Sequence, residues 1–95
     1  MTNEEILQYV ASSIKAIRHA KRLSQLELSV RANMSQSFLA NIETGKKEPS
    51  TMTLIRLARA LEVSPKDFFP AHQGDSSFDI KEEIKGEIRR LLAQL

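Results

Sequence analysis

The sequence predicts an all-α fold, with five short helices in residues 1–70 and an amphipathic helix at the C-terminus. Three observations favour this class. The 95 residues include three glycines, three prolines and 5% aromatics, whereas the helix formers Leu, Ile, Ala, Lys, Arg and Glu are abundant. Apolar residues recur at spacings of three and four in several segments. Serine, threonine or asparagine precedes most of these segments, where a helix N-cap is expected.

The first expected helix spans about residues 4–21. Thr2 or Asn3 can cap it, and the glutamates in its first turn suit the positive end of a helix dipole. Apolar side chains spaced four, four and three apart form its stripe: Ile6, Val10, Ile14 and Ile17. The stripe predicts that one face of this helix packs on a core.

A second and a third helix are expected close together. Ser24 caps the second, Glu27 completes a capping box, and the helix ends near Asn33, which tolerates the left-handed conformation. Its expected apolar contacts are Leu26, Leu28, Val30 and Ala32. Ser35 opens the third helix and Gly45 stops it. The apolar side of the third helix is Phe38, Leu39 and Ile42.

A fourth helix follows the loop 45–50 and starts at Ser50 or Thr51. Its apolar residues fit the full amphipathic template of i, i+3, i+4 and i+7: Leu54, Leu57, Ala58 and Leu61. Ser64 and Pro65 then suit the cap and first position of a fifth short helix. That helix carries two aromatic residues before Pro70 ends it: Phe68 and Phe69.

The chain therefore divides into a domain at 1–70, a linker at 71–79 and a helix at 80–95. The linker is indicated by its Gly, Ser, Asp and Pro content. The last segment has one broad apolar face made of Ile80, Ile84, Ile88, Leu91, Leu92 and Leu95. A monomer would expose this face, so it either packs back on the domain or pairs with the same residues of a second copy.

Charge favours placed contacts over bulk attraction. The net charge is only +2, and the ten basic and seven acidic side chains of residues 1–70 hold the excess. A protein that held nucleic acid by bulk charge alone would be expected to carry more. Any anionic partner must therefore be met by cations at particular positions.

Residues 24–45 combine two short helices with a tight turn around Asn33-Met34-Ser35, and the second helix ends in Ile-Glu-Thr-Gly. This pattern resembles the Cro/repressor-like (XRE-type) helix-turn-helix family over about residues 10–69. The matching residues in this segment and just before it are Arg18, Gln25, Leu28, Ala32, Ser35, Leu39, Ile42, Glu43 and Gly45. Arg22 and Asn33 stand where many relatives have glycine.

The resemblance implies a five-helix repressor-like domain whose recognition helix, about residues 36–44, enters the major groove of DNA. Amides and hydroxyls there can pair with base edges, which makes Gln36, Ser37 and Asn41 the expected base readers. Contacts to the DNA phosphates are expected from helix starts and nearby cations: Ser24, Gln25, Ser35, Lys46, Lys47 and Arg22. Phe38 is expected to pack against a sugar of the DNA backbone. The resemblance also implies that Arg18 and Glu43 form a buried structural ion pair.

The expected function is a transcriptional regulator, a repressor or autoregulator, that binds double-stranded operator DNA. Symmetric half-sites about 34 Å apart call for a homodimer, which favours self-pairing of residues 80–95. The alternative is an antitoxin-like or antirepressor-bound module in which this helix engages another polypeptide, so a regulatory protein is a further candidate partner.

Other function classes are not supported by the residue pattern. Neither His19 nor His72 has cysteines or spaced carboxylates beside it, so we expect no metal. No serine has a patterned histidine base and no glycine-rich phosphate loop occurs, so we expect neither an enzyme nor a cofactor. No ligand domain follows residue 70, which argues against a small-molecule sensor. Without a long apolar run, the protein is expected to be cytoplasmic and to make no membrane contact.

Overall fold

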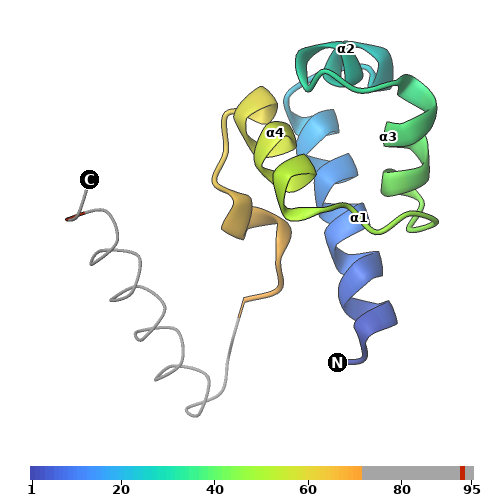
Figure 1. The fold of residues 1–95 in the computed structure, drawn as a ribbon, viewed down its shortest axis with the longest axis vertical. Helices are drawn as coiled ribbons and strands as arrows, with labels where there is room; N and C mark the ends of the chain where they lie inside the picture. The colour runs from blue at the N-terminus through green and yellow to red at the C-terminus, as the bar shows by residue number, and fades with distance from the viewer. Residues whose placement is uncertain (72–92, 94–95) are drawn as a thin grey trace.

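A computed structural model describes residues 1–71 and residue 93 of the chain. Within this part the elements are four α-helices and one 3₁₀ helix (Figure 1): α1 (Asn3–Ala20), α2 (Gln25–Arg31), α3 (Gln36–Glu43), α4 (Thr51–Leu61) and η1 (Pro65–Phe68). The expected linker beyond residue 71 and the apolar face of the expected helix 80–95 lie outside the described residues.

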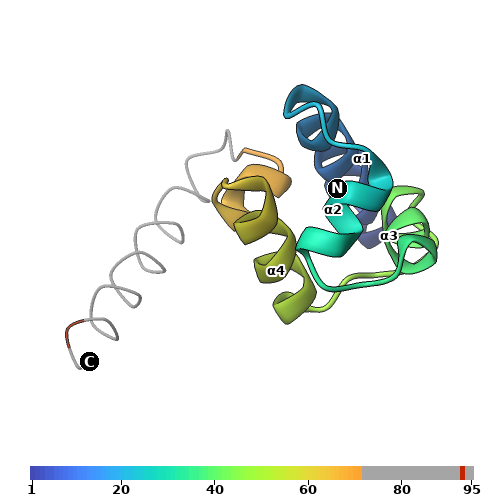
Figure 2. The same cartoon turned by 90° about the horizontal axis from the view of Figure 1, so that it is seen from above.

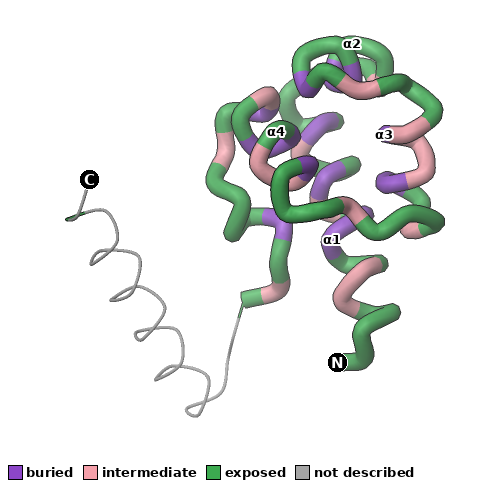
Figure 3. The backbone as a smooth tube through the Cα atoms, in the orientation of Figure 1, coloured by how far each residue is buried: buried purple, intermediate pink, exposed green. Residues whose placement is uncertain are grey.

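Helix α1 is the centre of the packing. It contacts α3, α4 and η1, while α2 packs on α3 and α4. Two views at right angles show α3 on one side of the bundle and α4 with η1 on the other (Figures 1 and 2). Figure 3 marks the buried positions along the backbone. The buried side chains form one core cluster, whose largest members are Ile14, Leu28, Leu39, Ile42, Leu57, Leu61 and Phe68.

Every α-helix starts at a side-chain cap that the sequence predicts. The hydroxyls of Thr2, Ser24, Ser35 and Ser50 accept the backbone N–H three residues later, at 3.0–3.1 Å. Each cap satisfies one of the N–H groups that a helix start leaves without a partner. The caps therefore fix where the two helices of the helix-turn-helix begin.

Two expectations for the core are wrong. Leu26 and Val30 are 55% and 70% exposed, whereas Leu28 and Ala32 are buried. Residues two apart are separated by about 200° around a helix, so an alternating pattern puts two of the four on the outer face. The expected fifth helix begins at Pro65 and is a single 3₁₀ turn of four residues, which ends before Phe69.

Left-handed residues close three of the turns. The φ angles of Arg22, Asn33 and Glu62 are 57°, 56° and 58°. Arg22 and Asn33 occupy the positions where the sequence resemblance leads one to expect glycine, and Asn33 takes the conformation expected of it. Gly45 ends α3 with φ 79°, and a Cβ there would collide with the Gln8 side chain. The left-handed residues Asn33 and Gly45 therefore mark the turns before and after α3.

Candidate nucleic-acid interface

The outer face of α3 is polar and uncharged. Gln36 and Ser37 are exposed and Asn41 is half-buried, whereas Leu39 and Ile42 on the opposite face are fully buried. The buried pair fixes the rotation of the helix about its axis, because turning it would expose both apolar side chains. The three residues expected to read bases thus share one helix held in one orientation.

The lysine loop that follows α3 is tied to the same helix. The backbone N–H groups of Lys46 and Lys47 both donate to the carbonyl of Asn41, at 2.9 and 3.1 Å. Both lysine side chains are exposed. Two flexible cations therefore stand directly at the C-terminal end of α3.

Contacts remote in sequence brace both ends of α3. The Gln8 amide on α1 donates to the carbonyl of Thr44 at 3.5 Å, and Arg56 on α4 donates to the carbonyl of Asn33 at 3.4 Å. Sequence reasoning missed both residues. Gln8 and Thr44 lie 36 positions apart, so no local spacing signal links them.

Arg18 and Glu43 form a buried ion pair between α1 and the last residue of α3. Arg18 Nε and Nη2 donate to the two carboxylate oxygens at 2.8 and 3.0 Å, and Nη1 donates to the carbonyl of Leu23 at 2.9 Å. Each residue is 7% exposed. The guanidinium thus joins α1, the α1–α2 turn and α3 through charge-assisted hydrogen bonds.

Gln25, the first residue of α2, extends this network. Its half-buried amide Nε2 donates to Glu43 Oε1 at 3.2 Å. A carboxamide nitrogen carries two N–H donors, so one remains for a phosphate oxygen. The residue expected to contact the DNA backbone is therefore also a link between the first residue of α2 and the end of α3.

The other expected backbone contacts lie at the helix starts and turns. Ser24 and Ser35 are exposed, and both hydroxyls accept a capping N–H. This leaves the Ser35 O–H able to donate, whereas the Ser24 side chain also hydrogen-bonds the Glu27 carboxylate. Arg22 is exposed in the α1–α2 turn. Phe38 is half-buried and packs on the core, so only part of its ring remains for contact with a sugar.

The capping box at the start of α2 makes its stability depend on pH. Hydrogen bonds to its carboxylate from the backbone N–H and then the side chain of Ser24 hold the pKa of Glu27 below its usual value. We expect Glu27→Ala to be less stable than the wild type at neutral pH and the difference to shrink as pH falls through the lowered pKa. Denaturant unfolding measured across this pH range tests the expectation.

The direction follows from the sign of the shift. A carboxyl whose pKa is lowered by folding adds stability above its unfolded value and loses that contribution on protonation. Glu62→Asn is the control, because Glu62 is exposed and asparagine tolerates its left-handed conformation. An equal difference between Glu27→Ala and the wild type at all pH values would contradict a charged capping box.

The part of the chain that the structure describes, residues 1–71 and 93, holds no group of three or more His, Cys, Asp or Glu side chains that could ligate a metal. None of its helices combines the length and apolarity that crossing a bilayer requires.

The helix-turn-helix of this chain is similar to known proteins in sequence and in fold. The helix-turn-helix family model matches residues 14–68. An uncharacterized HTH-type transcriptional regulator of Sinorhizobium fredii is 32% identical over 94 residues, covering 93% of this chain and 48% of that protein. The immunity repressor protein of Bacillus phage phi105 is 44% identical over 54 residues, covering 57% of this chain and 38% of that protein. The chain thus spans less than half the length of these two relatives.

Solved structures show the same arrangement of helices. The restriction-modification controller protein C.AhdI from Aeromonas hydrophila superposes with a TM-score of 0.65 at 28% identity, covering 66% of this chain and 96% of that chain. An HTH_3 family transcriptional regulator from Vibrio cholerae superposes with a TM-score of 0.67 at 28% identity, covering 70% of this chain and 38% of that chain. With the family model matching more than half of its residues, the chain belongs to the XRE-type helix-turn-helix family of transcriptional regulators.

Proposed function

We propose that this chain is a sequence-specific repressor or autoregulator that binds a palindromic DNA operator as a homodimer, with α3 in the major groove. One observation carries the proposal: Gln36, Ser37 and Asn41 lie on the outer face of a helix that is braced at both ends, with Lys46 and Lys47 at its C-terminal end. Amides read base edges and cations meet phosphates, so this arrangement suits specific recognition.

The relatives support a regulatory role. One is named an immunity repressor and another a restriction-modification controller. Both names denote regulators, and both proteins match this chain over its helix-turn-helix domain in sequence or in fold. By analogy, we propose Gln36, Ser37 and Asn41 as base readers and the helix starts at Ser24 and Ser35 as phosphate contacts.

A homodimer supplies the second recognition helix that binds the second half-site of a palindrome. We propose that the apolar face of residues 80–95 joins the two copies, since that face would otherwise be exposed in a monomer.

Selection of bound sequences from a random DNA pool tests the whole proposal. We expect a two-fold symmetric consensus with half-sites about 34 Å apart or a multiple of it. Recovery of unrelated sequences would contradict specific binding, and a single unrepeated site would contradict the dimer.

The lysine loop carries a second prediction. Replacing Lys46 and Lys47 with alanine should weaken binding to operator and to random DNA alike, because phosphates carry no sequence information. The magnitude of the slope of log K against log salt should fall by about 3.6 if each of the four lysines of the homodimer neutralises one phosphate. Fluorescence titrations over a range of salt concentrations measure both effects.

A matched double variant controls for net charge. Lys15 and Lys66 are exposed on α1 and η1, away from the α3–α4 loop. The variant Lys15→Ala/Lys66→Ala removes the same charge, and we expect it to leave the salt slope nearly unchanged. Equal slopes for the two double variants would mean that the loop has no special role in phosphate binding.

A further inference from the structure

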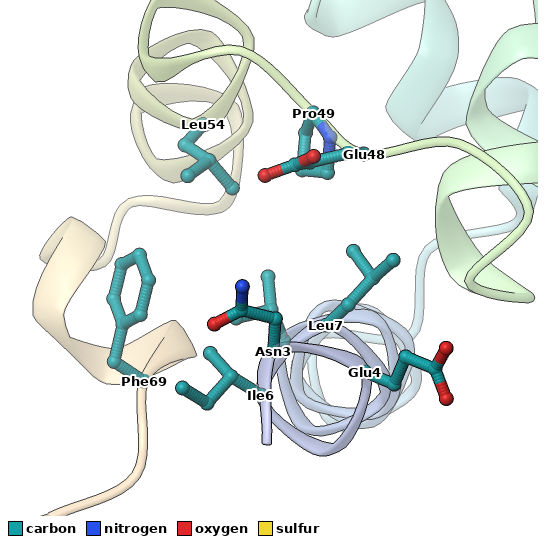
Figure 4. A pocket seen from close by; sticks show the side chains of 9 residues that line it. Asn3, Glu4, Ile6, Leu7, Glu48, Pro49, Leu54 and Phe69 are labelled. Carbon is teal, nitrogen blue, oxygen red and sulfur yellow. The ribbon is translucent and has the colours of Figure 1, made fainter. Parts of the chain in front are cut away.

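An apolar groove lies on the side of the molecule where α1 begins. Its volume is about 360 Å³, and its walls come from α1, the α3–α4 loop, α4 and the residue after η1. Figure 4 shows Ile6 and Leu7 of α1 along one wall, Leu54 and Pro49 opposite them, and Phe69 closing one end. Phe69 is 42% exposed although it is a large aromatic residue. Apolar area of this kind gains free energy when a partner covers it.

Two carboxylates border the groove. Glu4 extends from the first turn of α1 and Glu48 from the α3–α4 loop, and both are exposed. An occupant that combines an apolar stripe with cations beside it would therefore complement the groove in both hydrophobicity and charge.

Residues 80–95 have this pattern. In a helix, Ile80, Ile84 and Ile88 would form a stripe at four-residue spacing. Each is followed directly by a cation, so one flank of the stripe would be basic: Lys81, Lys85 and Arg89. No other part of the 95-residue sequence repeats an apolar residue followed by a cation at this spacing three times in succession.

We infer that the groove receives residues 80–95 of a second copy of this chain, and that the second copy's groove receives the same segment in return. This inference rests on the proposed homodimer and names the surface that its C-terminal segment contacts. A two-fold dimer requires a self-complementary surface, and each copy brings one groove and one segment. Reciprocal docking covers both grooves together with the isoleucine stripe of each segment, whereas pairing of segment with segment leaves both grooves exposed.

The docking site adjoins the candidate DNA interface. Glu48 and Pro49 line the groove, and Lys46 and Lys47 directly precede them in the same loop. A segment seated in the groove would therefore contact the loop that carries the phosphate-binding lysines. Dimer formation and phosphate binding would then share one structural element.

The first test changes the groove alone in the full-length chain. Leu7 is half-buried in the groove wall, and Leu7→Glu places a charge there while keeping a good helix former. Ser12→Glu adds the same charge at an exposed position of α1 outside the groove. Sedimentation equilibrium should show the dimer dissociation constant raised about tenfold or more for Leu7→Glu and little changed for Ser12→Glu.

A second variant avoids the core entirely. Glu4 and Glu48 are both exposed, so Glu4→Lys/Glu48→Lys should leave the fold intact, as circular dichroism would verify. This variant should also dissociate, because basic flank and basic border would repel. Mixing it with Lys81→Glu/Lys85→Glu chains should restore a heterodimer, since the reversed segment matches the reversed groove.

Two results would overturn the inference. A wild-type chain that is a monomer would place the segment in its own groove or leave the groove empty. A Leu7→Glu chain as dimeric as Ser12→Glu would mean that the segments pair with each other. Binding of Leu7→Glu monomers to a single operator half-site keeps the two proposals apart, because it depends on α3 and not on the groove. If the Leu7→Glu chain keeps its half-site specificity and stays dimeric, the groove inference is wrong and the proposed DNA-binding function is unaffected.

Discussion

Replacing Glu43 with alanine is expected to lower the free energy of unfolding by roughly 3–5 kcal/mol, because it leaves the Arg18 guanidinium buried without its counter-ion. Arg18 is 7% exposed, and two of its nitrogens donate hydrogen bonds to the Glu43 carboxylate at 2.8 and 3.0 Å. Small domains are stable by only about 5–15 kcal/mol, so the variant should lose a large share of its stability. Denaturant unfolding followed by circular dichroism measures the change.

A paired substitution separates the charge effect from packing. In Arg18→Met/Glu43→Leu no buried charge remains, so we expect this variant to be more stable than Glu43→Ala. Recovery should be incomplete, because the carbonyl of Leu23 and the amide of Gln25 lose their partners. Lys15→Ala serves as the exposed control and should change stability little. A Glu43→Ala chain as stable as Lys15→Ala would show that the ion pair is not buried in solution.

Local signals in the sequence predict much of the fold. The caps at Thr2, Ser24, Ser35 and Ser50 act within three residues, and the structure has each of them. Helical periodicity likewise places buried side chains correctly where residues are three or four apart. Both signals depend on neighbours along the chain, which is why one sequence suffices to find them.

The two wrong expectations have physical reasons. The alternation of Leu26, Leu28, Val30 and Ala32 suits a strand face better than a helix face, so only half of these residues are buried. The turn 65–68 has too few residues to settle between 3₁₀ and α geometry from its cap and proline alone. Packing of Phe68 under α1 decides its position, and packing is not local.

In the candidate interface, too, the sequence predicts the features that depend on local signals and misses those that depend on tertiary packing. Residue type and helical position pick out Gln36, Ser37 and Asn41, whose place on the outer face of α3 follows from the burial of Leu39 and Ile42. The bracing of α3 by Gln8 and Arg56, and the bond from Gln25 to Glu43, join segments 18 to 36 residues apart. Such pairs depend on tertiary packing, and spacing along the chain carries no sign of them.

Replacing Gln36 and Asn41 with alanine is expected to remove discrimination between operator and random DNA. A good amide–base pair contributes about 1–3 kcal/mol of discrimination, so each side chain should account for roughly a 5- to 150-fold difference at each half-site. In a homodimer the loss occurs at both half-sites. Non-specific affinity should change little, because the phosphate contacts of Lys46 and Lys47 remain. Parallel titrations with selected operator and random duplexes measure the ratio.

The unfolding free energy decides how a loss of specificity is interpreted. Gln36 is exposed, Asn41 is half-buried, and it is the backbone carbonyl of Asn41, which alanine retains, that holds the lysine loop. The double variant should therefore unfold like the wild type, and Ser12→Ala, an exposed change on α1, should alter neither stability nor binding. Unchanged discrimination in a folded double variant would show that α3 does not read bases through these amides. Loss of operator and random binding together would instead assign them to the DNA backbone.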